Sequence, residues 1–328
     1  MVIDAYSHVF PMRLIDALAE VSPSAELNAL RGQSSYLYDD DRRVAFMDDS
    51  GFDIQVLVLA RPPVWLGMSR PDIHRLTRVA NDSIAEFVKR RPDRFIGVGV
   101  MPVVDEVMME EFERVHAELG LKGVLIFSNI EGKPVDDPSM WPLYERAAAV
   151  DLPIWIHPQH ANLYPWIGKD VLDRTLAWPF DTSLAMARLA YGGVFEKYPG
   201  IRFMTHHMGA MIPYFAARID AFARTTAPEY ARLGIGGSSG PQLTGPAIDH
   251  FRRFYNDSIS NGSVEALTMA TRFFSVEHIL LGTDFPFGPE DGSWARDELR
   301  AVRESPLSPA DRELILHGNA ERFLGLRG

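Results

Sequence analysis

The chain has 328 residues, of which 46% are hydrophobic and 23% are charged, and its formal net charge is −11. These values are typical of a globular protein long enough for one β/α barrel, and the acidic balance argues against nucleic acid or an anionic membrane as a partner. The absence of cysteine excludes disulfides, thiolate metal sites and cysteine nucleophiles, so any metal ion must be bound by nitrogen and oxygen.

Short apolar, β-branched runs alternate with segments of helical period along the chain. We predict strands at residues 2–6, 53–59, 94–101, 123–127, 154–157, 202–207, 254–259 and 279–284. Helices are expected around residues 71–90, 106–119, 139–149, 182–197, 211–225, 263–274 and 309–323. Eight strands that alternate with helices indicate an α/β fold, a closed (β/α)8 barrel of the TIM type.

Three stretches lack this pattern, at residues 20–40, 160–180 and 226–250. We interpret them as loops over the barrel mouth, because no charge run or low-complexity tract accompanies them, and we expect one domain over residues 1–328. The GIGGSSG segment follows no strand and opens no clear helix, so it indicates a flexible lid or loop and no organic cofactor. No apolar run reaches the roughly 18 residues of a membrane helix and no signal peptide is evident, so we expect a cytoplasmic protein.

Histidine and aspartate residues stand where predicted strands end. They are His8 in IDAYSH, His157 in IWIHP, His206 and His207 in MTHHMG, and Asp284 in LLGTDFP. Parallel β/α barrels gather their catalytic side chains at this end of the strands. Packing does not explain the set, because core strands favour Val, Ile and Leu and a buried charge needs a partner. The pattern therefore predicts a metal site.

The segments WPFDTSLAMARLAYGGVFEKYPGIRFMTHHMGAMIPYFAARID, LLGTDFPFGP and ILHGNAERFLGL carry a resemblance to a known family. The chain resembles the amidohydrolase-related decarboxylases of the aminocarboxymuconate semialdehyde decarboxylase type, which include γ-resorcylate and 5-carboxyvanillate decarboxylases and some hydratases and hydrolases. The resemblance extends from Asp4 to Leu326. It implies an amidohydrolase-type barrel that binds one divalent metal ion, zinc or alternatively manganese or magnesium, and that is commonly a homodimer.

The resemblance also implies roles for individual residues. The implied metal ligands are His8, His157 and Asp284. His207 matches the family's catalytic histidine, because Gly209 and Pro213 then stand at the expected offsets. Strand side chains alternate in direction, so we expect His207, and not His206, to point into the barrel. Asp284 is implied as the second catalytic residue.

Tyr6 occupies the position of the family's first ligand, a histidine or in some members a glutamate. A phenol with an ordinary pKa near 10 is a poor ligand at neutral pH unless the metal stabilises the phenolate. Three roles stay open for Tyr6: a fourth metal ligand, a hydrogen-bond donor to the substrate, or a wall of the site.

Substrate contacts are expected from residues near the barrel mouth. Arginine binds a carboxylate through its planar fork, and Arg218 matches an arginine that reaches a neighbouring subunit's site in the family. Its alternative is a solvated helix-surface arginine. The remaining candidates are Arg61, Tyr6, His160, Trp178 and Phe285.

The hypothesis for function is metal-dependent, non-oxidative decarboxylation of a small aromatic or unsaturated carboxylic acid. The run GVLIFSN at the fourth predicted strand ends in Phe127, Ser128 and Asn129, without the lysine that bridges two metals in binuclear amidohydrolases, so one ion is expected. The alternatives are a metal-dependent hydrolase or hydratase, in which the metal activates water, and a non-catalytic paralogue whose metal site Tyr6 has broken.

Overall fold

Parallel strands form a closed barrel in the computed structural model, which describes residues 1–21, 34–60, 67–159, 166–234 and 243–326. The barrel strands are β1 (Ile3–Val9), β2 (Ile54–Leu59), β3 (Phe95–Gly97), β4 (Gly99–Val100), β5 (Val124–Phe127), β8 (Ile154–His157), β9 (Phe203–Thr205), β10 (Tyr255–Asp257) and β11 (Ile279–Leu280). A small antiparallel hairpin of β6 (Asn129–Ile130) and β7 (Lys133–Pro134) follows β5. The strands predicted from the sequence are confirmed, most of them a few residues shorter than expected.

Backbone hydrogen bonds close the barrel at two places where the regular ladders stop. β3 and β4 are two parts of one strand, interrupted at Val98, whose N–H donates to the carbonyl of Leu57 at 3.0 Å. The last strand meets the first: the N–H of Ala5 donates to the carbonyl of Leu281 at 2.7 Å, and the N–H of Thr283 to that of Tyr6 at 3.2 Å. Since neighbouring strands are parallel, their carboxyl ends open on one mouth. The (β/α)8 barrel expected from the sequence is confirmed.

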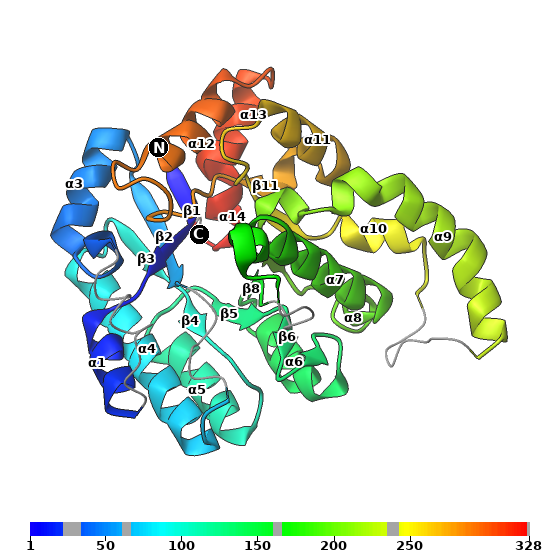
Figure 1. Ribbon diagram of the computed structural model, residues 1–328, viewed down its shortest axis with the longest axis horizontal. Coiled ribbons are helices and arrows are strands. Elements are labelled where there is room, and N and C mark those ends of the chain that lie inside the picture. Colours follow the sequence, from blue (N-terminus) through cyan, green and yellow to red (C-terminus); the bar gives the residue numbers. More distant parts are fainter. Residues whose placement is uncertain (22–33, 61–66, 160–165, 235–242, 327–328) are drawn as a thin grey trace.

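Helices surround this barrel (Figure 1). They are α1 (Met12–Val21), α3 (Asp40–Ser50), α4 (Arg70–Arg90), α5 (Glu106–Ala117), α6 (Trp141–Ala149), α7 (Trp178–Tyr191), α8 (Val194–Lys197), α9 (Ile212–Arg232), α10 (Ala247–Phe251), α11 (Val264–Phe274), α12 (Ser293–Glu304), α13 (Pro309–Glu313) and α14 (Asn319–Phe323). Side-chain caps explain several starts, since Ser69, Asp105 and Ser263 accept hydrogen bonds from backbone N–H groups in the first turns of α4, α5 and α11. Within the described residues no helix is both long and apolar enough to cross a membrane.

The structure corrects part of the loop assignment. Helices α1, α3 and α12 were not expected. The stretches 160–180 and 226–250 contain a π-helical turn at Asp173–Ala177, the last turns of α9 and most of α10. Residues 235–242, which hold most of GIGGSSG, lie outside the described residues.

A buried polar network fixes the strand end that carries His8. The carboxylate of Asp4 accepts hydrogen bonds from Gln55 Nε2 at 3.0 Å and from Thr283 Oγ1 at 2.6 Å, which links β1 to its neighbours on both sides. Arg43, from α3, is fully buried and donates to the carbonyl of His8 at 2.7 Å. Because buried polar groups are costly unless paired, these contacts hold the carboxyl end of β1 in one place.

Candidate active site at the barrel mouth

The ends of the first and last strands meet through two side chains that are 276 residues apart in sequence. His8 Nε2 and Asp284 Oδ1 lie 2.8 Å apart, and His8 Nδ1 lies 3.3 Å from the carbonyl of Leu59. The ring of His157, at the end of β8, lies 5.8 Å from the ring of His8, measured between centroids. The structure therefore brings together the three residues for which metal binding was expected.

Burial and mutual charge set the protonation of this cluster. Burial, followed by the positive charges of His8 and His206, holds the pKa of His157 well below its usual value, which favours the neutral ring that a metal ion requires. For Asp284, burial by itself raises the pKa, but the hydrogen bond with His8 and the charges of His8, His207 and His157 outweigh it and lower the pKa. The Asp284 side chain is 31% exposed, so an anionic carboxylate faces the mouth.

His206 lies against Tyr6 and is fixed by an aspartate. Its ring stacks on that of Tyr6 with a centroid distance of 3.7 Å and an interplanar angle of 27°. Its Nδ1 lies 2.8 Å from Oδ2 of Asp257, while Oδ1 of Asp257 accepts the backbone N–H groups of His207 at 2.8 Å and Ile259 at 3.1 Å. Burial raises the pKa of Asp257 to about 7.

The expectation that only His207 points inward is not what the structure shows. His206 keeps an extended backbone and is fully buried, whereas His207 is half-buried. β9 ends at Thr205 and His207 has a φ of 55°, in the left-handed region, so the strict alternation of strand side chains stops before this residue. Alternation along the strand therefore does not decide which of the two rings points into the barrel. The charge of His207 lowers the pKa of Asp284, which places the two groups in the same electrostatic environment.

Tyr6 is 2% exposed, with its ring 4.7 Å from that of His8 between centroids. Burial, followed by the negative charges of Asp284 and Asp257, raises its pKa well above the usual value. The protein by itself therefore keeps the hydroxyl of Tyr6 protonated, as a hydrogen-bond donor or a wall of the site requires.

The other candidate substrate contacts are scattered. Trp178 is half-buried at the start of α7, and its ring meets that of His157 edge to face at 5.8 Å. Phe285 instead is 1% exposed and stacks on Phe46 at 4.1 Å, so it packs in the core. Arg218 is exposed on α9 and lies over Phe222 of the same helix. Arg61 and His160 lie outside the described residues.

Two further residues, Asp257 and Phe287, belong to the site but were not predicted from the sequence. Asp257 holds His206, and the ring of Phe287 lies 5.1 Å from that of His8. Asp257 lies inside the seventh predicted strand, in FYNDSIS, whereas the observed strand β10 already ends at Asp257; with that end, the strand-end argument that selected Asp284 would have selected Asp257 as well.

The end of β5 carries no group that would bridge two metal ions. Ser128 Oγ accepts the backbone N–H of Gln159 at 2.7 Å, and Asn129 Nδ2 donates to the carbonyl of Gln159 at 2.6 Å. Both side chains thus tie β5 to the segment after β8.

Metal binding requires donors that are free to turn toward an ion. Among the described residues, no group of three His, Cys, Asp or Glu side chains is already arranged around a common point. The physical reason is visible at His8, whose Nε2 is occupied by the hydrogen bond with Asp284. The donor set nevertheless fits a divalent ion, since it offers imidazole nitrogen and carboxylate oxygen, and Nε2 of His206 and Nδ1 of His207 are buried without a hydrogen-bond partner.

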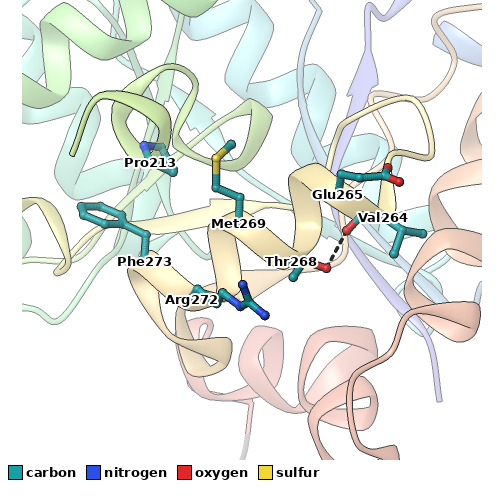
Figure 2. A pocket seen from close by; sticks show the side chains of 7 residues that line it. All are labelled: Pro213, Val264, Glu265, Thr268, Met269, Arg272 and Phe273. Atoms are coloured by element: carbon teal, nitrogen blue, oxygen red, sulfur yellow. Dashed lines mark hydrogen bonds between the residues drawn. The ribbon is translucent and has the colours of Figure 1, made fainter. Parts of the chain in front are cut away.

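A surface groove between α9 and α11 is separate from this cluster (Figure 2). Its lining consists of Pro213, Val264, Glu265, Thr268, Met269, Arg272 and Phe273. None of the expected site residues lines the groove, so we define the candidate site by the strand-end cluster.

Comparisons with known proteins identify the family of the chain. The sequence profile of the amidohydrolase family matches residues 3–326. A gamma-resorcylate decarboxylase from Polaromonas sp. strain JS666 is 32% identical over 313 residues, 90% of this chain and 90% of that protein. A 2-amino-3-carboxymuconate-6-semialdehyde decarboxylase from Dictyostelium discoideum is 31% identical over 300 residues, 89% of this chain and 78% of that protein.

Solved structures share the fold of this chain. A dihydroxybenzoic acid decarboxylase from Polaromonas sp. JS666, with bound manganese and the inhibitor 2-nitroresorcinol, superposes with a TM-score of 0.79 and 28% identity over 100% of this chain and 98% of that one. A 5-carboxyvanillate decarboxylase from Novosphingobium aromaticivorans has a TM-score of 0.85 over 99% of this chain and 96% of that one, and at 24% identity it supports the fold alone.

Proposed function

The chain belongs to the amidohydrolase family, and from this premise we propose that it is a metal-dependent, non-oxidative decarboxylase of a small aromatic carboxylic acid. One observation carries the proposal: His8, His157 and Asp284 are far apart in the sequence, but they gather at the carboxyl ends of the barrel strands. Nitrogen and oxygen donors at that place suit a divalent ion with positions left for a substrate.

His8, His157 and Asp284 would hold the ion. A bound divalent cation supplies Lewis-acid stabilisation of negative charge on the oxygens of the substrate. The neutral state of the buried His157 leaves a lone pair for this purpose, and the lowered pKa of Asp284 keeps its carboxylate charged. The manganese of the Polaromonas structure supports a divalent ion, with zinc and magnesium as alternatives.

The chemistry needs one proton at a carbon atom. The bond between the ring and its carboxylate breaks, carbon dioxide leaves, and the electron pair that remains on the ring carbon takes a proton. His207 and Asp284 are the proposed proton carriers, since the charge of His207 acts on Asp284 and both residues are partly exposed. Trp178, edge to face with His157, and the buried ring of Tyr6 form apolar walls that suit an aromatic substrate and keep water out.

A homodimer is part of the proposal. Large apolar side chains stay exposed on α7 and α9, which lie on one side of the barrel (Figure 1). They are Phe180, Leu184, Tyr214, Phe215, Phe222 and Tyr230. A second copy that covers this surface would bury them and bring Arg218 of α9 to an interface. Light scattering of the purified protein tests it: a monomer at all concentrations would contradict a dimer.

Carbon dioxide release tests the proposed reaction. Protein loaded with Mn²⁺ is mixed with 2,6-dihydroxybenzoate and related hydroxybenzoates, and carbon dioxide and the decarboxylated phenol are measured. Equal yields of both that depend on the metal support the proposal. The rival is hydrolysis or hydration, in which the same ligands activate water. It predicts that oxygen from ¹⁸O-labelled water enters the product and that no carbon dioxide forms.

A further inference from the structure

His206 is an unusual residue for its position. It is fully buried beside the expected metal ligands, and its ring lies 6.1 Å from that of His157 between centroids. Its Nε2 has no hydrogen-bond partner in the described part of the chain. A contact of hydrogen-bond type with the backbone of Ile156 raises the pKa of His206, but it does not meet full hydrogen-bond geometry at Nε2. A buried polar atom without a partner destabilises the folded protein, so a ligand for it is the simplest explanation.

Asp257 prepares this nitrogen for a cation. Its Oδ2 lies 2.8 Å from Nδ1 of His206, and its other oxygen accepts two backbone N–H groups. When Asp257 is ionised, it accepts the proton of Nδ1, and the lone pair of the neutral imidazole resides on Nε2. Metal-binding histidines show this same arrangement, with a carboxylate on the ring nitrogen that does not bind the ion.

Tyr6 stands where the first-strand ligand of the resembling family would stand, and its ring is used for packing. It lies flat against His206, on the side of the cluster that His8 also borders. The imidazole of His206 therefore lies directly beside the residue that stands at the position of the missing ligand.

We propose that His206 replaces the lost first-strand ligand, so that Nε2 of His206 joins His8, His157 and Asp284 in binding the divalent ion, with Asp257 as the residue that orients it. This inference rests on the proposed function. The substitution of tyrosine at the first strand is then compensated from the sixth strand, and the site keeps three imidazoles and one carboxylate.

Manganese binding measures the proposal without turnover. The free Mn²⁺ signal in electron paramagnetic resonance gives the affinity, and pulsed measurements count the imidazole nitrogens coupled to the bound ion. We expect three coupled imidazoles in the unsubstituted protein. In His206→Asn we expect two, with affinity reduced at least about 100-fold, and in Asp257→Asn three, with affinity reduced about 10- to 100-fold, as for other residues that orient a ligand.

His250→Asn is the matched control. His250 is also buried, has an unpartnered Nδ1 and lies 3.4 Å from a carboxylate oxygen of Glu196, but it belongs to α10 on the outside of the barrel. Its substitution should leave manganese affinity unchanged. Circular dichroism and thermal unfolding check that each variant folds; if His206→Asn does not fold, the nitrogen count of the unsubstituted protein decides.

The outcomes separate this inference from the proposed function. Unchanged affinity and nitrogen count in His206→Asn, with binding lost in His157→Ala, would overturn the role of His206 and leave the metal site intact. Two coupled imidazoles in the unsubstituted protein would also overturn it. If the unsubstituted protein binds no Mn²⁺, both the inference and the proposed metal-dependent reaction are wrong.

Discussion

Glu298→Gln is expected to remove a loss of folding stability that occurs as the pH rises and that originates next to the site. The Glu298 side chain, on α12, is 2% exposed, and its Oε1 accepts the backbone N–H groups of Ser260 at 2.7 Å and Gly262 at 3.2 Å. It thereby holds the segment that follows β10 and Asp257. Burial raises its pKa from 4.5 to about 7, although these backbone donors lower it.

The sign follows from proton binding. Since the folded pKa exceeds the unfolded one, the folded state binds more protons between about pH 4.5 and pH 7, and the contribution of Glu298 to stability is lost as the pH rises through 7. The full difference corresponds to about 3 kcal/mol, at about 1.4 kcal/mol per pKa unit. Glutamine keeps the acceptor oxygen and carries no charge. The variant should therefore gain about 2–3 kcal/mol relative to the unsubstituted protein between pH 5 and pH 8.5.

Urea unfolding at both pH values measures this difference. Glu304→Gln is the control, because Glu304 is exposed on the same helix, and its effect should not change with pH. A constant difference between Glu298→Gln and the unsubstituted protein across this range would refute the reasoning, since Glu298 would then have the same pKa in both states.

Further substitutions test the site directly. His157→Ala should abolish both metal binding and turnover. Asp284→Asn should retain some metal, measured by elemental analysis, and lose at least about 100-fold in kcat. Equal metal loss in both variants would argue against a proton-carrying role for Asp284, because loss of the ion would then explain the loss of turnover. Tyr6→Phe should leave manganese affinity unchanged if His206 has taken its place, and a large loss of affinity would identify the phenol as a ligand. Gly209→Ala should destabilise the protein by about 1–3 kcal/mol in thermal unfolding, because the residue has a φ of 74° and a Cβ would lie 2.4 Å from the Phe274 ring; an unchanged melting temperature would contradict this contact.

The sequence predicts the strands better than the helices, for a physical reason. Barrel strands are buried on both faces and read as apolar runs, as in Ile154–His157. The helices α3 and α12 were missed because charged residues belong to their buried faces, namely Arg43 and Glu298. Their partners come from distant segments, so no local pattern reveals them. Helix α1, by contrast, has a regular apolar face in its sequence, with Leu14, Ile15 and Leu18 buried.

The candidate site shows the same division. The position of His8, His157 and Asp284 at strand ends was enough to predict that these residues lie close together. Strand-end position did not show which of His206 and His207 points into the barrel, because the left-handed backbone of His207 breaks the alternation on which that prediction depended. The packing of Phe285 in the core depends on α3, which the sequence analysis had not found.

Elemental analysis of the purified protein after dialysis, before and after titration with Mn²⁺, tests the central claim most directly. The account predicts binding of about one divalent ion per chain, lost in His157→Ala, as expected for a mononuclear site at the barrel mouth. A protein that holds no metal and takes up none on titration would contradict it, and the barrel would then serve a function that needs no metal ion.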